Sequence, residues 1–280
     1  MSKEKILEFP VPAHLSKFRD FLDKHARYPI ALILRGVPIH NPNHIPGPIS
    51  SHPTGSRIGG PAFITPKSPW PRDRHGKRML FFAQINLADI PSLPGYRSDG
   101  LLQFFIGDHG YYGMEDDDFN MPENFASPHN RAVRYIPSEE YPIGRIEGGL
   151  KSQANNIENG YFRIKPVIYK QYPNPTDLSF ERIFEFDGSK EEDEFISWLT
   201  ELHYHGPQAI FGGGWAKLCQ YDRYGLTLHD TTLLRVNNVR ERTTNVKLVW
   251  GDEGTGNFFI NPKDLAEWNF DNVVYYWDYH

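Results

Sequence analysis

A pattern of paired glycines followed by aromatic runs occurs twice in this chain and constrains its fold more than any other feature. GGPAF at residues 59–63 and LLQFFI at 101–106 correspond to GGWA at 213–216 and GNFFI at 256–260. In both copies 44 positions separate the second glycine from the first phenylalanine, Gly60 from Phe104 and Gly214 from Phe258. A middle run, FAQIN at 82–86 against LRVN at 234–237, lies between them. The spacing predicts two related halves that arose by internal duplication.

Short strands and turns are favoured in both halves. The 280 residues include 23 prolines and 24 glycines, so long helices should be scarce. Brief apolar or aromatic runs bounded by turn residues predict strands, among them residues 30–34, 165–169, 183–186 and 273–277. We expect an α+β fold that is β-rich, with the two related halves packed as one compact unit.

Two segments have the periodicity of amphipathic helices. Residues 15–26 carry apolar side chains at three- and four-residue steps, and residues 189–205 carry an apolar stripe. The second segment begins with a capping box, Ser189 and Glu192, and ends at Gly206-Pro207. Asn261-Pro262 predicts a further short helix before the last strand.

These patterns divide the chain into three segments. Residues 1–56 contain the N-terminal helix, a strand and a loop rich in proline and histidine. Residues 57–150 form the first β-rich repeat, and residues 151–280 form the second, with its amphipathic helix. Irregular polar sequence between residues 108 and 160 separates the repeats. We expect all three segments to belong to one globular unit.

Charge and cysteine content disfavour several classes of protein. The net charge of −5 disfavours nucleic acid and anionic membranes as partners. The one cysteine, Cys219, cannot form an internal disulfide, and the N-terminus has charges where a signal peptide needs an apolar core. No run approaches the roughly 20 apolar residues of a membrane span. We therefore expect a cytoplasmic protein.

The sequence has no recognised catalytic, cofactor or metal signature. The glycine pairs do not fit the nucleotide-binding patterns GxxxxGK[ST] or GxGxxG, and GxSxG and HExxH are absent. The acidic run at 115–118 lacks the spaced oxygens of a calcium loop, and the histidines at 40, 44 and 52, and at 203 and 205, lack metal-ligand spacing. We predict no cofactor and no bound metal. A non-enzymatic role is favoured, and catalysis is left open.

Polar side chains within the apolar runs are candidate ligand-binding residues. The candidates are Arg57, Gln84, Asn86, Arg235, Asn237 and Asp252. Period-two alternation puts the two polar residues of each middle run on one face of its strand. If that face lines a cleft between the halves, these side chains would form its polar lining. The alternative is that they bond to nearby backbone, as most buried polar groups do.

Aromatic and basic residues beside turns are candidate interface residues. A basic cluster at residues 72–78 is typical of a hairpin tip, which can face an acidic partner or only solvent. Tryptophan and arginine are frequent at the hot spots of protein interfaces. The candidates are Trp70, Arg72, Arg74, Trp215 and Arg223.

Several motifs follow one another in a fixed order. They are Gly59-Gly60, Trp70-Pro71, FAQINL at 82–87, LLQFFI at 101–106, Gly213-Gly214, Gln220, Asp222, Leu233-Leu234, WGD at 250–252, FFI at 258–260 and Asp264-Leu265. Together they resemble the bacterial YwqG-like family, a domain of unknown function, over roughly residues 58–278. The chain departs from that family at Arg235, where glutamine is usual, and at Arg223, where proline is usual.

The resemblance implies an α+β fold of two related β-rich halves and carries no established activity. Some relatives are encoded near toxin genes, which implies an interaction or immunity role. Together with the lack of catalytic signatures, this favours a protein that binds another protein. The specific expectation is an immunity protein that neutralises a toxin. The alternative is a small-molecule-binding protein or hydrolase that uses a cleft between the halves. The oligomeric state does not follow from the sequence.

Overall fold

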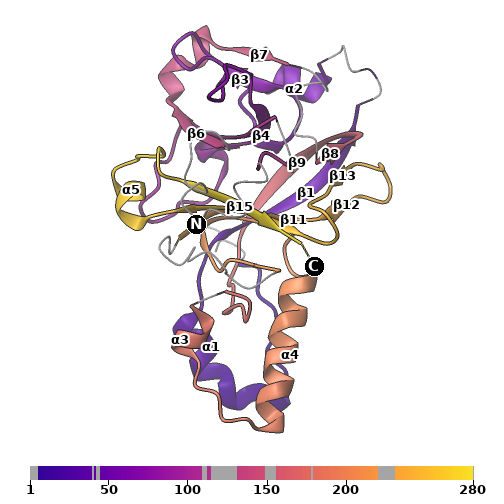
Figure 1. Ribbon diagram of the computed structural model, residues 1–280, viewed down its shortest axis with the longest axis vertical. Helices are drawn as coiled ribbons and strands as arrows, with labels where there is room; N and C mark the ends of the chain where they lie inside the picture. The colour runs from indigo at the N-terminus through magenta and orange to yellow at the C-terminus, as the bar shows by residue number, and fades with distance from the viewer. Residues whose placement is uncertain are drawn as a thin grey trace.

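One antiparallel sheet of ten strands forms the body of the protein (Figure 1). The computed structural model describes residues 6–39, 41, 45–108, 112–114, 131–148, 156–177, 179–219 and 231–279. The strands, in spatial order, are β15 (Val274–Asp278), β14 (Thr255–Ile260), β11 (Thr231–Asn237), β10 (Ala209–Gly214), β1 (Ile30–Pro38), β9 (Gly160–Ile168), β2 (Arg57–Ile58), β4 (Leu80–Asn86), β5 (Leu101–Ile106) and β6 (Arg131–Ile136).

The sheet consists of two four-stranded parts on either side of a central pair. We call β2, β4, β5 and β6 the first half-sheet, and β10, β11, β14 and β15 the second half-sheet. Between them lie β1 and β9, which pair from Ile30 opposite Ile168 to Pro38 opposite Gly160. A strand from the N-terminal segment is therefore at the centre of the sheet.

The two half-sheets have β-bulges at corresponding places. The pairing of β4 with β5 shifts between Phe81 and Ala83, and the pairing of β11 with β14 shifts between Thr232 and Leu234. A bulge changes which side chains face each side of a strand. After it, Gln84 lies opposite Gln103 in one half-sheet, and Arg235 lies opposite Asn257 in the other.

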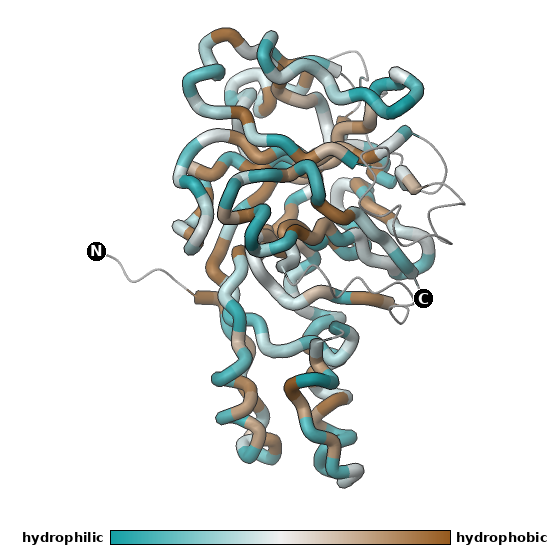
Figure 2. Tube along the Cα trace, turned by 60° about the vertical axis from the view of Figure 1, so that its left-hand side comes forward, coloured by the Kyte–Doolittle hydropathy of each residue, from teal (hydrophilic) through white to brown (hydrophobic). Residues whose placement is uncertain are grey.

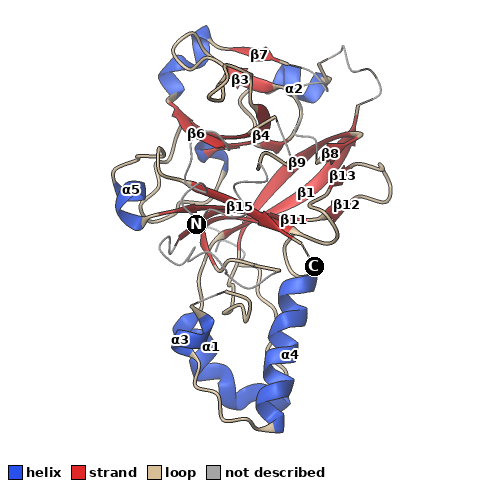
Figure 3. Cartoon of the chain, viewed as in Figure 1, coloured by secondary structure: helices blue, strands red, loops and turns tan. Residues whose placement is uncertain are grey.

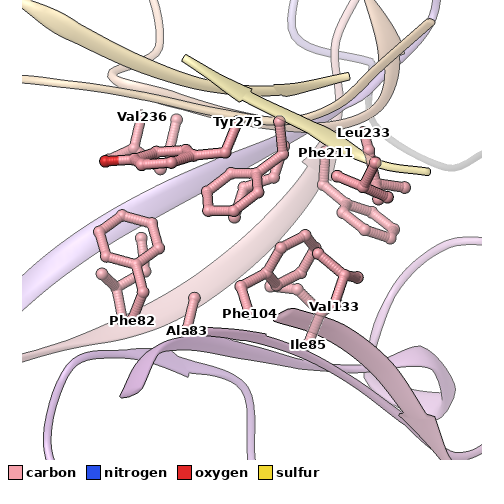
Figure 4. Packing of buried hydrophobic residues seen from close by; sticks show 14 of the residues in the cluster. Phe82, Ala83, Ile85, Phe104, Val133, Phe211, Leu233, Val236 and Tyr275 are labelled. Atoms are coloured by element: carbon pink, nitrogen blue, oxygen red, sulfur yellow. The ribbon is translucent and has the colours of Figure 1, made fainter. Parts of the chain in front are cut away.

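The half-sheets face each other across a large apolar core (Figure 4). Phe82 and Phe104 project from the first half-sheet toward Phe211 and Tyr275 of the second. The ring of Phe258 joins the two layers, since its centroid lies 5.9 Å from that of Phe82 and 5.1 Å from that of Phe104. Burial of each such side chain contributes roughly 1.5–3 kcal/mol, so this core is the main source of stability.

An arginine links the two edges of the sheet. Arg131 on β6 is buried, and its guanidinium donates to the carbonyl oxygens of Asp271 and Val273, directly before β15. The first and last strands of the spatial order are therefore close to one another.

Helices are concentrated in an extension that projects from one end of the sheet (Figures 1 and 3). This helical extension contains η1 (Ala13–Phe18), α1 (Arg19–His25), α3 (Phe180–Ile183) and α4 (Lys190–His205). Polar and apolar residues alternate along its helices (Figure 2), and the apolar ones form a separate small core that includes Leu22, Phe195 and Leu199. Both amphipathic helices expected from the sequence are therefore confirmed. Among the described residues, no helix combines the length and the apolar character needed to cross a membrane.

The predicted strand at residues 183–186 is wrong. This segment follows the short helix α3, where Phe180 and Phe184 stack with their centroids 5.3 Å apart and pack into the core of the extension. Aromatic residues four positions apart share one side of a helical turn, and this spacing prevails over their preference for strands.

Smaller elements complete the fold. Within the N-terminal proline-rich loop lies a one-turn helix, α2 (Gly47–Ser51), in which Pro48 occupies the first turn, where its missing N–H costs nothing. The predicted helix after Asn261 is α5 (Pro262–Ala266). Two small sheets contain β3 (Ala62–Ile64) with β7 (Arg145–Glu147), and β12 (Val239–Arg240) with β13 (Lys247–Leu248) and β8 (Ile157–Glu158).

Candidate functional site

The polar residues predicted in the first half lie on the outer face of the first half-sheet. Gln84 and Arg57 are almost completely buried. Arg57 donates to the carbonyl oxygens of Pro53, Gly55 and Pro61, and Gln84 donates to those of Pro53 and Gly55. These side chains hold the loop that covers the sheet. The face toward the other half-sheet is apolar, so they do not lie between the halves.

The second half has a similar arrangement around Arg235. This residue is 1% exposed, and its guanidinium donates to the carbonyl oxygens of Trp215 and Pro207, each at 3.2 Å. Burial lowers the pKa of Arg235 to about 10, so the group remains a cation at neutral pH. Among the described residues it has no carboxylate partner.

Phe63 beside the first half-sheet and Lys217 beside the second occupy corresponding positions but have different surroundings. Gln103 donates to the carbonyl oxygen of Phe63 at 2.6 Å, and Asn257 donates to that of Lys217 at 3.0 Å. Both the donors and the acceptors are 154 residues apart, the same offset that separates Gly60 from Gly214. Phe63 is buried against Tyr141, with centroids 5.8 Å apart, whereas Lys217 lines a pocket.

Side chains fix the backbone around Lys217 on both sides. Trp215 N donates to Gln171, Ala216 N to Asp177 and Leu218 N to Thr176, at distances from 2.8 to 3.3 Å. Asn174 donates to the Ala216 carbonyl, and Cys219 N donates to Asp278 at 2.8 Å. We call residues 215–219 the anchored segment. Its backbone is held in place by side chains from four separate parts of the chain: residues 171–177, Arg235, Asn257 and Asp278.

The pocket beside the anchored segment has a volume of about 460 Å³ and a polar lining. It lies where the end of α4 and the loop after it meet the ends of β11 and β12. The lining residues are Tyr204, His205, Gln208, Lys217, Asn237, Asn238, Val239, Arg240, Arg242, Glu253 and Gly254. Three basic side chains, Lys217, Arg240 and Arg242, against the one carboxylate of Glu253 make the pocket suited to an anion.

Lys217 is the buried charge of this pocket. Its side chain is 9% exposed, and its Nζ lies 5.3 Å from the centre of the Tyr204 ring. Within the described part of the chain, the ammonium makes no hydrogen bond and no ion pair. Burial lowers the pKa of Lys217; nearby Arg235 lowers it further, while Cys219, Glu253 and Asp278 act in the opposite direction.

Two further groups of the lining bear on what can bind. Tyr204 donates its hydroxyl to the Glu253 carboxylate, and this bond raises the pKa of the phenol. Asn237 is 3% exposed and accepts from the Thr255 hydroxyl at 3.3 Å, but its Nδ2 has no hydrogen-bond partner among the described residues. The pocket thus offers a proton donor and acceptor pair together with an unsatisfied amide.

The remaining candidate residues are dispersed. Asn86 is buried at the end of β4, where it caps a short turn, and Asp252 lies exposed on the turn before β14. Of the six ligand-binding candidates, Asn237 lines the pocket and Arg235 lies beneath it. The structure does not bring the other four to this site.

The interface candidates differ in exposure. Arg72 and Arg74 are exposed on a hairpin, as expected of its tip, whereas Trp70 and Trp215 are buried. Arg223 lies outside the described residues, as do His40, His44 and the acidic run at 115–118.

No group of three or more histidine, cysteine, aspartate or glutamate side chains suited to a metal ion occurs in the described ranges. His203 is buried and bonded to the carbonyl oxygens of Tyr172 and Pro173. Burial, the largest influence, raises the pKa of Cys219 to about 12, so its thiol is protonated at neutral pH.

Sequence reasoning missed Lys217, Tyr204 and Glu253. The signal for Lys217 was the offset of 154 residues, which aligns this lysine with the apolar Phe63. Tyr204 and Glu253 had no such signal, because their meeting depends on how α4 packs beside the second half-sheet.

Fold and site thus define the class of this protein: it is a β-rich α+β protein with a cationic pocket at the outer face of one half-sheet. The chain belongs to the family described as Domain of unknown function (DUF1963), which matches residues 56–279. The match includes both half-sheets and the whole pocket, and leaves out β1 and α1. No curated protein matches this chain.

Proposed function

We propose that the protein binds a small anionic molecule, carrying a carboxylate or a phosphate group, in the pocket at Lys217. The observation that carries this proposal is a lysine that is nine-tenths buried, fixed through its backbone, and without a hydrogen bond or ion pair of its own among the described residues. Removing a charge from water without a partner costs several kcal/mol, and a bound anion would offset that cost.

The rest of the lining supports an anion of modest size. Arg240 and Arg242 are exposed at the pocket and add long-range attraction. Asn237 and Gln208 provide amide groups for orientation, while Glu253 is engaged with the Tyr204 hydroxyl. A pocket of this volume matches those that hold small metabolites.

Calorimetric titration with inorganic phosphate and with pyruvate tests the proposal. Lys217→Met should weaken binding roughly 10- to 100-fold, because a hydrogen bond to a charged group contributes about 1.5–3 kcal/mol. Lys263→Met, which removes an exposed lysine on α5, serves as the control and should bind as the unchanged protein does. Equal affinity of the Lys217→Met variant and the unchanged protein for both probes would refute the proposal.

We also propose that the half-sheets descend from an internal duplication. Their equal strand order, their bulges at corresponding positions and the shared 154-residue offset support it. Likewise, we propose that this chain is a YwqG-like protein of bacterial origin that acts in the cytoplasm. The order of the motifs supports the YwqG-like family, and the presence of a single cysteine supports the cytoplasm.

A second candidate function is binding of another protein through the helical extension. Phe186 is 56% exposed although it contacts Phe184, with centroids 5.1 Å apart. Exposed carboxylates surround it in sequence at Glu185, Asp187 and Glu191. An apolar anchor with an acidic rim suits a basic partner, and a toxin to be neutralised is the concrete version.

This candidate predicts that Phe186→Ser abolishes recovery of a stoichiometric partner from native lysate. Ile143→Ser is the matched control, because Ile143 is 50% exposed but lies beside the first half-sheet. Recovery that is unchanged by Phe186→Ser would exclude the extension as the binding surface.

A further inference from the structure

The pocket places an amine opposite a proton donor and acceptor pair. We propose that Lys217 forms a reversible Schiff base with a small carbonyl compound that carries an anionic group, a 2-oxo acid being the simplest example. This inference rests on the proposed function, because the anionic group is what the cations of the pocket would hold. It adds that the bound molecule has a carbonyl carbon within reach of the Lys217 Nζ.

Lys217 differs from another shielded lysine, Lys170, in having no carboxylate partner among the described residues. The ammonium of Lys170 is also shielded, at 15% side-chain exposure, but it lies 2.8 Å from carboxylate oxygens of both Glu8 and Asp23. An ammonium held between two carboxylates keeps its proton. Lys217 has the Tyr204 ring beside it and no carboxylate within ion-pair distance in the described ranges.

The surroundings of Lys217 favour the neutral amine, which is the nucleophilic form. The charged and titratable groups that face it are Arg235 from β11, Tyr204 and His205 from α4, Arg240 from β12, Arg242, Cys219, Glu253, and Asp278 from β15. Burial and Arg235 lower the lysine pKa, in the direction that activates an amine. The Cys219 thiol does not compete, because its own pKa is raised to about 12.

The proposed step needs no oxidant or reductant. The lone pair of the Lys217 nitrogen attacks the carbonyl carbon, and the π electrons move to the oxygen, which takes a proton from the Tyr204 hydroxyl. The nitrogen then gives up a proton to the pair formed by Tyr204 and the Glu253 carboxylate. A second proton from this pair releases the oxygen as water while the C=N bond forms, and the iminium nitrogen returns its remaining proton to the pair. One amine and one carbonyl yield one imine and one water.

Trapping with sodium cyanoborohydride tests the inference on the 280-residue chain. Pyruvate is the probe, and intact-mass measurement followed by peptide mapping locates the reduced adduct. We expect one adduct, at Lys217, forming measurably faster than at the exposed Lys67 and Lys263, because the lowered pKa of Lys217 leaves more of its amine neutral. Lys217→Arg keeps the charge but cannot form the adduct, so it should bind phosphate and remain unlabelled.

Tyr204→Phe tests the role of the hydroxyl in the chemical step. It should slow adduct formation at Lys217 several-fold, because it removes the proposed proton donor and retains the ring beside the lysine. If phosphate binds but Lys217 is labelled no faster than Lys67, the Schiff base is refuted and the proposed function stands. If neither probe binds and no adduct forms at Lys217, both fail.

Discussion

His203 is a titratable side chain that lies buried on α4 against two backbone carbonyl groups. It is 3% exposed, and its Nε2 lies 3.1 Å from the Tyr172 carbonyl oxygen and 3.0 Å from that of Pro173. Two acceptors on one ring nitrogen require that this nitrogen carries the proton. Burial, reinforced by nearby Arg235, lowers the pKa of His203 to about 3, so the folded protein holds the ring neutral.

This histidine should make the protein sensitive to mild acid. Below pH 6.5 the unfolded chain takes up a proton that the folded chain does not, so the free energy of unfolding falls as the pH falls. The expected loss is about 1.4 kcal/mol per pH unit, or about 2 kcal/mol between pH 6.5 and pH 5. Urea denaturation at several pH values measures it.

The control for this prediction is His203→Gln, which retains an N–H donor and does not titrate. It should be less stable at pH 7 because its shape differs, but its stability should depend less on pH over that range. An unchanged pH dependence would show that other groups cause the acid sensitivity.

Single residues also show where sequence reasoning reaches its limit. Alternation predicted that Gln84 shares a strand face with Asn86, and Arg235 with Asn237, because side chains in a strand have a period of two. It could not predict what covers that face. The loops that accept these hydrogen bonds come from distant parts of the chain and have no periodicity of their own.

At the scale of elements, the anchored segment couples the second half-sheet to the pocket. Asn257 on β14 supports it from below, since its amide donates to the Lys217 carbonyl, as Gln103 on β5 does to the Phe63 carbonyl. The position of the Lys217 ammonium therefore depends on a residue that does not line the pocket.

Replacing these two amides gives a matched pair of variants. Asn257→Ala and Gln103→Ala should each cost about 1–3 kcal/mol of unfolding free energy, because each leaves a buried carbonyl without its donor. Only Asn257→Ala should weaken phosphate binding, by several-fold. Denaturation and calorimetry measure the two effects. A loss of phosphate affinity in Gln103→Ala as large as that in Asn257→Ala would mean that binding merely follows overall stability.

Elements whose pattern is local were predictable, and elements defined by their neighbours were not. The helix α4 has both a capping residue and an apolar stripe, and Ser189 does accept from Glu192 N at 3.2 Å. The aromatic residues of segment 183–186 are compatible either with a strand or with the end of a helix. What decides between them is the contact of Phe184 with Phe195 and Phe18, which are separated from it along the chain.

At the scale of the molecule, the sequence predicted a β-rich chain with two matching runs, but it did not predict how they are joined. The equal spacing of the motifs indicates that two segments are alike, but it does not indicate which strands lie between them in the sheet. The central strand β1 comes from the N-terminal segment, and the sheet bends so that Arg131 reaches the chain before β15. These are long-range pairings, and no local pattern encodes them.

The central position of β1 has a consequence for how the chain folds. Each half-sheet contains a hairpin of strands that follow one another along the chain, β4 with β5 in the first and β14 with β15 in the second, and these can form early. The partners of β1 on β9 lie 122 to 138 residues further along the chain, so joining the halves requires closure of a very long loop. The two hairpin units should therefore be assembled before the sheet is complete. Until β9 and β10 are made, the apolar run that begins at Ile30 has neither of its partner strands, so during synthesis it presents the kind of unpaired apolar surface that chaperones bind.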